Sequence, residues 1–429
     1  MRTGSSQRRF RNDTAATLMT LPEALATILK HAEPVESVEV SLTEAVGLVL
    51  AEPTFADVDL PPFDRASASG YAVRALEAVP GTLLRVAAPW IDADGERHEI
   101  ESGEASRVEA GEALPVGADA VLADDAVRND SGESPACVIE VRRGAEPGQS
   151  VIRRGATLAA GSILAGAGTR ITPAMVALLA AQGCVHPICH RRVRVSIVAV
   201  GEHLVSPADA PILHHERNAG NLAVAALLVG AGAMVHDLGA LPESEFAVAL
   251  DRAVNSPIVL ILGRITGEIC RALARAGVEP TVSGVALEPL GGLDVGHGVA
   301  RDDDGRVVAH VIHLPLDPTT AVAVATLVVL PLVARLQGAD PTGPATLRAT
   351  WDSHQSSTSD RLRAVPATLA AGADGRLHAR PVVAFGPTDL PDLALADGLA
   401  LFPPDAGPWH GGEVIDFAPF ATWPGRTEV

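Results

Sequence analysis

Two places in the chain put residues that bind ligands directly after an apolar stretch. Glu202 and His203 follow residues 193–201, and Gly263 follows residues 258–262. A continuous apolar run that ends in glycine is typical of a buried parallel strand, and ligands bind outside the carboxyl ends of such strands. We therefore expect a ligand cleft here, with Glu202 and His203 as its candidate metal ligands.

Two further segments carry residue types suited to a site. Residues 184–190 hold two cysteines and two histidines, but their spacing matches no standard zinc motif. Incidental burial is the simpler interpretation, and a metal site is the alternative. The loop at residues 59–73 contains adjacent prolines and the only tyrosine, Tyr71. Such a loop is either a fixed backbone for a binding site or an ordinary turn between domains.

Composition limits the classes of function. The 429 residues include 33 basic and 52 acidic side chains, a net charge of -19, which disfavours contact with nucleic acid. A hydrophobic content of 47% indicates large cores. The only lysine is Lys30, so we expect no mechanism that depends on a buried lysine. The four cysteines suggest no disulfide framework, and no apolar signal-peptide core follows the basic start. The longest apolar run is shorter than the roughly 20 residues that a bilayer requires. We expect a cytoplasmic protein without membrane contact.

The elements that must position these residues follow from the periodicity of apolar side chains. Helical spacing is expected at 21–31, 43–48, 173–182, 221–232, 243–254 and 320–336. Strands are expected at 37–42, 83–87, 120–122, 137–141, 193–201, 234–238 and 258–262. Alternation of strands and helices after residue 193 predicts an α/β domain with a parallel sheet.

The expected fold class is α/β plus β, in several domains. The predicted parts are a disordered tail (1–20), a discontinuous first domain (21–58 and 142–190), an inserted β-rich domain (59–141), an α/β domain (191–338) and a C-terminal β domain (339–429).

Motifs in order along residues 21–425 resemble those of the molybdopterin molybdenumtransferase family, which includes MoeA and the gephyrin E domain. Pro61–Ala72 resembles the family's Pro-Pro-Phe-Asp-Asn-Ser-Ala-Met-Asp-Gly-Tyr-Ala, and Pro115–Val121 resembles Pro-x-Gly-Ala-Asp-Ala-Val. Val198–Leu204 resembles the strand that ends in Gly-Asp-Glu-Leu. His313–Pro318 stands where Gly-Leu-Pro-Gly-Asn-Pro is usual.

The resemblance implies an elongated homodimer whose α/β domain binds molybdopterin, a small anionic pterin. It implies insertion of molybdate into adenylylated molybdopterin with release of AMP, assisted by magnesium. The cleft would lie between two subunits, with Ser69 of one facing Gly263 of the other. The implied cofactor-binding positions are Asp64, Gly70, Gly201, Asn218, Gly263, Thr266, Pro315 and Asp317. The matching catalytic positions, mostly substituted, are Ser69, Glu202, Arg264 and Glu288.

The substitutions change the charges of the implied site. Ser69 replaces a carboxylate, and His203 replaces the second acid of the family's Asp-Glu pair. Arg264 replaces the second glycine of the phosphate loop, while Glu288 and Gly291 stand at the two lysines. Reversing a charge beside an anion changes the interaction by several kcal/mol at ~4 Å and an effective dielectric near 20.

Two hypotheses follow from the resemblance and its departures. One is a divergent transferase in which Arg264, Glu202 and Asp294 compensate for the lost groups. The other is a paralogue with lost catalysis that binds the cofactor or acts as a scaffold, paired with an active relative or a molybdoenzyme.

Overall fold

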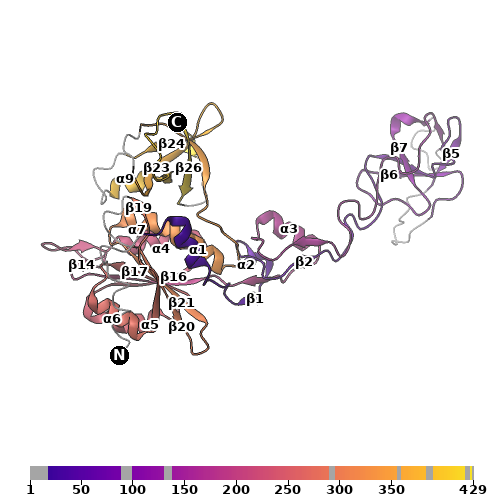
Figure 1. Ribbon diagram of the computed structural model, residues 1–429. Helices are drawn as coiled ribbons and strands as arrows, with labels where there is room; N and C mark the ends of the chain where they lie inside the picture. Colours follow the sequence, from indigo (N-terminus) through magenta and orange to yellow (C-terminus); the bar gives the residue numbers. More distant parts are fainter. Residues whose placement is uncertain are drawn as a thin grey trace. The chain divides into compact units, whose positions relative to one another are not determined.

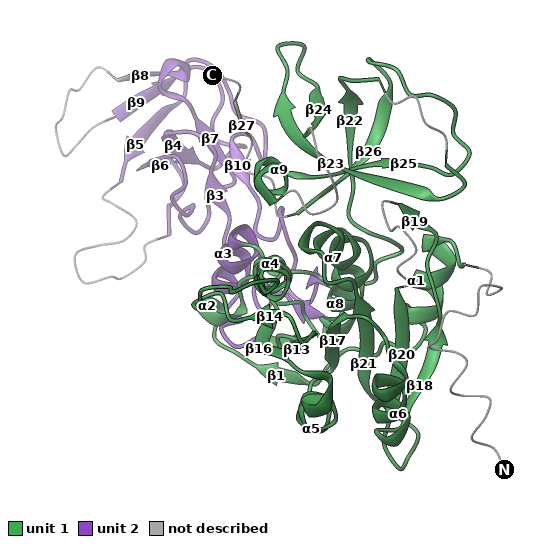
Figure 2. Cartoon of the chain, turned by 90° about the vertical axis from the view of Figure 1, so that its left-hand side faces the viewer, with its two compact units in different colours: residues 1–52, 167–172, 188–429 green, residues 53–166, 173–187 purple. Residues whose placement is uncertain are grey.

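The computed structural model describes residues 18–87, 99–129, 138–288, 295–354, 359–382, 390–420 and 426–427. It divides into two compact units, coloured separately in Figure 2. Unit 1 comprises residues 1–52, 167–172 and 188–429, and unit 2 comprises residues 53–166 and 173–187.

Unit 1 contains the expected α/β sheet, which is labelled in part in Figure 1 and in full in Figure 2. Its strand order is β16 (Met234–Leu241), β13 (Arg194–Val200), β17 (Ile258–Gly263), β21 (Val307–Leu314), β20 (Gly296–Arg301) and β18 (Val278–Val282). The first four strands are parallel, and β20 and β18 run antiparallel to their neighbours.

Alternating side chains of β13 build two cores, one on each face of the sheet. Val195 and Ile197 pack with α1 (Leu21–Leu29), α4 (Gly220–Gly230), α7 (Pro318–Val324) and α8 (Leu330–Leu336). Val198 and Val200 pack with α5 (Phe246–Ala253) and α6 (Gly267–Arg275). Burial on both faces explains why this strand is a continuous apolar run.

One long helix spans Pro318–Leu336 and passes through a π-helical turn, η3 (Ala325–Val329). Pro331 has no N–H for the regular helical bond, and a wider turn just before it accommodates that loss. The helix is long and apolar enough to cross a membrane, yet 83% of its most apolar window is buried. This matches the expectation of core packing.

The C-terminal part of unit 1 is a closed barrel of five strands. Around it run β23 (Leu362–Ala371), β24 (Leu377–Pro381), β22 (Leu347–Trp351), β26 (Val414–Pro419) and β25 (Gly398–Phe402), which pairs with β23 again. The short strands β19 (Leu287–Glu288) and β27 (Arg426–Thr427) also pair with β23. The remaining elements of unit 1 are α2 (Leu42–Ala45), β1 (Ser37–Glu39) with β12 (Ile188–His190), β14 (Leu204–Val205) with β15 (Glu216–Arg217), η2 (Glu243–Glu245) and α9 (Leu390–Leu395).

Unit 2 is β-rich, as expected. Its main sheet has the order β7 (Ala120–Leu122), β4 (Gly70–Val73), β6 (Glu104–Val108), β5 (Leu83–Val86), β9 (Val138–Val141) and β8 (Val127–Asn129). Unit 2 also contains two small strand pairs, η1 (Asp124–Ala126) and α3 (Pro173–Ala181). The pairs are β3 (Arg65–Ala66) with β10 (Val151–Ile152), and β2 (Thr54–Phe55) with β11 (Ile163–Ala165).

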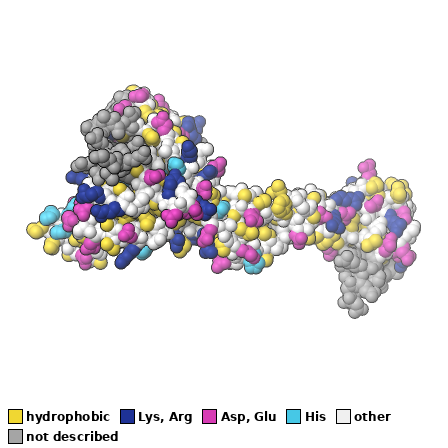
Figure 3. Space-filling model, turned by 60° about the horizontal axis from the view of Figure 1, so that its bottom comes forward, with side chains coloured by type: hydrophobic (Ala, Val, Ile, Leu, Met, Phe, Trp, Pro, Cys, Tyr) yellow, Lys and Arg dark blue, Asp and Glu magenta, His cyan; other side chains and the backbone are white. Residues whose placement is uncertain are grey.

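Acidic and basic side chains are interspersed on the face of the molecule shown in Figure 3, although the chain as a whole is acidic.

The expected helices and strands are all present, with small shifts of their ends. Among the elements that the sequence interpretation did not name are α6 and the strands β18, β20 and β21. The last two of these strands contain a buried pair of histidines. His297 Nε2 and His310 Nδ1 are 3.0 Å apart, and His297 Nδ1 contacts the Thr281 hydroxyl. Burial lowers the pKa of His310 to about 4, and positive charge on His31 adds to the effect. Burial also lowers the pKa of His297, with positive charge on His310 and His31 adding to it.

These histidines make folding acid-sensitive. The unfolded chain takes up protons near pH 6.5 while the folded chain resists them, so stability is complete above that pH and falls as pH drops toward 4. For His310 alone we expect a loss of about 2 kcal/mol between pH 7.5 and pH 5. Urea unfolding at both pH values measures it. His310→Gln reduces the loss, whereas His236→Gln, at an exposed position of β16, leaves it unchanged; equal losses in both variants would contradict the assignment.

Candidate functional site

Three parallel strands of unit 1 end side by side. Val200 pairs with Gly263, and Leu262 pairs with Leu314. Gly201 and Pro315 directly follow their strands, so together with Gly263 they lie along one edge of the sheet. The sequence interpretation placed a ligand at this edge, and the structure brings those three residues to it.

Gly263 lies too close to the neighbouring strand for any side chain. Its φ is +148°, and a Cβ atom here would be 2.6 Å from the carbonyl oxygen of Val200. The carbonyl oxygen of Gly263 also contacts His313 Nε2. At Gly201 a Cβ would meet only ordinary contacts of 3.5 Å or more. Strand packing therefore requires glycine at position 263 but not at position 201.

The N-terminus of α4 approaches the loop that follows β21. A Cβ on Gly220 would be 3.1 Å from the carbonyl oxygen of Leu316, so glycine permits this approach. Asn218 Oδ1 accepts a long bond of 3.4 Å from the backbone N–H of Asn221. The Asn221 amide donates to Asp237 Oδ1 at 2.8 Å and to the carbonyl oxygen of Gly239 at 3.2 Å. Asn221 is fully buried and was not among the predicted site residues.

Asp317 is the N-cap residue of α7. Its Oδ2 atom accepts the backbone N–H of Thr320 at 2.8 Å. Its Oδ1 atom, Thr319 Oγ1 and Asn221 Oδ1 are buried without any hydrogen-bond partner in the part of the chain described. A buried acceptor left unpaired is costly, and such atoms in native proteins are normally satisfied by water or a ligand. The edge between α4 and α7 is therefore rich in unused acceptors.

A second cluster of polar residues at the same edge links the start of α6, η2 and the loop after β13. Thr266 caps α6 by accepting the backbone N–H groups of Glu268 at 3.2 Å and Ile269 at 3.3 Å. Its hydroxyl donates to Glu243 Oε1, and the backbone N–H of Glu243 donates to Glu202 Oε1 at 3.3 Å. Sequence reasoning missed Glu243, although it follows β16 and so belongs to the same set of strand ends.

The remaining predicted residues of this edge are exposed. Arg264 and His203 both lie at the surface. Among the residues that the structure describes, no group of three or more His, Cys, Asp or Glu side chains is arranged to hold a metal ion. The assignment of Glu202 and His203 as metal ligands therefore stays a prediction.

Glu288, which stands at a family lysine, forms an ion pair with a residue of the barrel. It lies opposite Arg363 where β19 pairs with β23, and Arg363 Nη2 is 3.3 Å from Glu288 Oε1. Both side chains are partly buried, at 35% and 19% exposure. The pair neutralises the charge that the substitution introduced. Gly291 and Asp294 lie outside the described residues.

In unit 2 the loop before β4 is held by ion pairs. Asp64 accepts from Arg153 Nη1 and from the backbone N–H of Arg154, both at 2.7 Å. The backbone bond from Arg154, followed by the Arg153 guanidinium, holds the pKa of Asp64 below its usual value. This carboxylate therefore fixes the loop, and its role in cofactor binding stays a prediction.

The predicted residues at the end of this loop also have clear contacts. Ser69 Oγ donates to Glu109 Oε2 at 2.5 Å, so a carboxylate lies beside the position where the family has one. Gly70 begins β4, and a Cβ there would be 2.1 Å from the carbonyl oxygen of Leu122. Gly70 is therefore required for strand packing.

The segment at residues 184–190 is divided between different environments. Cys184 is a free, half-buried thiol whose pKa is raised by burial. Cys189 is a buried cysteine in β12, and His190 Nδ1 is 2.7 Å from the carbonyl oxygen of Val35.

Known proteins resemble the chain over most of its length. A family model described as the MoeA N-terminal region, domains I and II, matches residues 19–183. Molybdopterin molybdenumtransferase 1 of Mycobacterium tuberculosis is 31% identical over 343 residues, which cover 74% of this chain and 78% of that protein. The molybdopterin molybdenumtransferase of Haemophilus influenzae is 26% identical over 329 residues, with coverage of 75% and 78%. A crystal structure of the MoeA protein from Pyrococcus horikoshii OT3 has the same fold, with a TM-score of 0.76 at 24% identity over 94% of this chain and 99% of that one.

The two strand-end glycines give a matched pair of variants. We expect Gly263→Ala to destabilise the protein by at least about 2 kcal/mol, because its Cβ would collide with a backbone oxygen. Gly201→Ala has space and should cost much less. Urea unfolding compares them, and equal losses would show that the close approach at Gly263 is not a constraint.

Proposed function

The chain belongs to the molybdopterin molybdenumtransferase (MoeA) family of molybdenum cofactor biosynthesis, and on that premise we propose that it is a divergent transferase. Its reaction is the insertion of molybdate into adenylylated molybdopterin, with release of AMP. The observation that carries this proposal is a set of buried polar atoms without a partner among the described residues: the acceptor oxygens Asn221 Oδ1 and Asp317 Oδ1, and the Thr319 hydroxyl, which can accept or donate. The amino and ring N–H groups of a pterin are the donors that such acceptors lack.

Charged groups from neighbouring elements support retained catalysis. Glu109 Oε2 accepts from the Ser69 hydroxyl, and the backbone N–H of Glu243 donates to Glu202 Oε1. Arg363 forms an ion pair with Glu288. Each brings the kind of charge that the motif has lost, from a different point in the sequence. For the lysine the replacement would be partial, because the Glu288–Arg363 pair is neutral overall.

The roles of the side chains follow from this arrangement. Asn221, Asp317 and Thr319 bind and orient the pterin. Arg264, exposed beside Gly263, supplies a positive charge for the anionic part of the substrate. Glu202 and Glu243 are the carboxylates suited to magnesium, which is usually held by one or two carboxylates together with substrate phosphates. When bound, magnesium neutralises negative charge on the leaving phosphate.

The neutral Glu288–Arg363 pair favours the alternative, a paralogue that binds the cofactor or a partner protein without catalysis. Fewer positive charges beside an anionic ligand weaken its binding and the stabilisation of charge in the transition state. A relative encoded in the same genome with both lysines intact would strengthen this alternative.

Turnover separates the two functions. Purified protein with adenylylated molybdopterin, molybdate and magnesium should release AMP above a blank without protein. Absence of release would reject the transferase. In that case calorimetric titration with molybdopterin tests the binding alternative, which fails if neither the pterin nor a partner protein binds.

Replacement of Glu243 tests whether it takes over the role of the lost acid. We expect Glu243→Gln to lower the rate of AMP release by roughly tenfold or more, as for groups that orient a site. Glu245→Gln removes the same charge from the same turn, at an exposed position, and serves as the matched control. A rate that responds equally to both changes would assign the effect to net charge.

A further inference from the structure

The C-terminal barrel carries a pair of histidines that the proposed function does not use. His354 follows β22 and His410 precedes β26, and both are exposed. Their Nδ1 atoms are 3.1 Å apart, whereas their ring centroids are 4.8 Å apart. The rings therefore approach each other through nitrogen atoms that can bind a metal ion.

We propose that His354 and His410 bind a divalent transition-metal ion of the Zn²⁺, Cu²⁺ and Ni²⁺ class. Zn–N bonds of about 2.0–2.1 Å in tetrahedral geometry place two ligand nitrogens about 3.3 Å apart. The observed 3.1 Å is close to that separation. Imidazole is a preferred ligand of all three ions. A direct N–H···N hydrogen bond is the competing explanation for the short distance.

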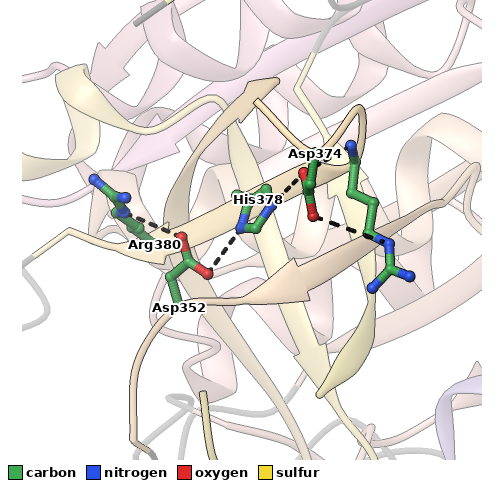
Figure 4. A network of polar contacts seen from close by, with 5 residues as sticks. Asp352, Asp374, His378 and Arg380 are labelled. Carbon is green, nitrogen blue, oxygen red and sulfur yellow. Dashed lines mark hydrogen bonds and ion pairs between the residues drawn. The ribbon is translucent and has the colours of Figure 1, made fainter. Parts of the chain in front are cut away.

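The segment that carries His354 is anchored two residues earlier, at Asp352. The backbone N–H of Asp352 donates to the carbonyl oxygen of Ala379 at 2.9 Å. Its carboxylate contacts His378 Nδ1 at 2.9 Å and Arg380 Nε at 3.2 Å (Figure 4). His378 Nε2 reaches Asp374 Oδ1 at 3.1 Å on its other side. Four polar side chains thus hold the backbone from which His354 extends.

The segment that carries His410 is anchored to the same strand. The backbone N–H of His410 donates to Glu413 Oε2 at 2.9 Å, and the carbonyl oxygen of Glu413 accepts the backbone N–H of Trp351 at 2.8 Å. The neighbouring Trp409 ring packs edge-on against Phe402, 5.5 Å between centroids. Because both segments are tied to the end of β22, little ordering is required to bring the two imidazoles together.

The site supplies two protein ligands. No third His, Cys, Asp or Glu side chain completes a metal-binding group within the residues described. Water or a small anion would fill the other coordination positions, as in metal sites that keep an open position.

Metal titration of the full chain at about pH 7.5, where free imidazole is mostly neutral, tests the proposal. Calorimetry with ZnCl₂ should detect one ion per chain, and His354→Ala or His410→Ala should each weaken binding by roughly tenfold or more, since each removes one of two ligands. Electron paramagnetic resonance with Cu²⁺ should show two imidazole nitrogens in the wild type and one in each variant. Circular dichroism verifies that the variants fold.

The control is the double variant His214→Ala, His215→Ala. The centroids of these two rings are also close, 5.0 Å apart, but His215 Nδ1 is hydrogen-bonded to the carbonyl oxygen of Ile212 at 2.7 Å. Zn²⁺ affinity should stay within about twofold of wild type there. No binding by the wild type, undiminished binding in His354→Ala and His410→Ala, or an equal loss in the control would overturn the proposal. AMP release plays no part in this test, so its outcome is independent of the proposed function.

Discussion

The packing of β13 against β17 is the constraint on which the α/β part depends. Both strands are buried on two faces, so helices must cover each side, and the strands must be parallel for those helices to connect them. The same parallel direction brings all the strand ends to one edge. Where that edge is tightest, Gly263 approaches Val200 so closely that only glycine fits. The position of the site is thus a consequence of how the core is built.

Chemistry at this edge depends on which polar groups have partners. Helix caps satisfy some of them: Thr266 accepts two N–H groups of α6, and one oxygen of Asp317 accepts the backbone N–H of Thr320 in α7. What remains is a small set of buried acceptors, on Asn221, Asp317 and Thr319. Unpaired buried polar atoms are unfavourable, so we expect water or a ligand to satisfy them.

Charged groups that are distant in the sequence lie beside several of the predicted site residues. Glu109 accepts from Ser69, the Glu243 carboxylate accepts from Thr266 while its backbone N–H donates to Glu202, and Arg363 pairs with Glu288. An electrostatic interaction depends on the distance between charges and on their burial, and it is indifferent to which strand supplies them. A charge that a motif lacks can therefore be supplied by a residue distant in the sequence. The exception is Glu288, whose pairing leaves no net positive charge.

The sequence by itself determined many of the regular elements and the sheet edge at which the strands of the α/β part end, because apolar periodicity and a terminal glycine are local signals, as in residues 193–201. It did not reveal α6. It also did not reveal β18, β20 and β21, whose sequences are interrupted by histidine, glycine or proline and lack a continuous apolar run. Only the tertiary structure decided which charges meet. Glu243 is 41 residues from Glu202, and Arg363 is 75 residues from Glu288. Contacts at such separations depend on strand order and register, which no local pattern of residues encodes.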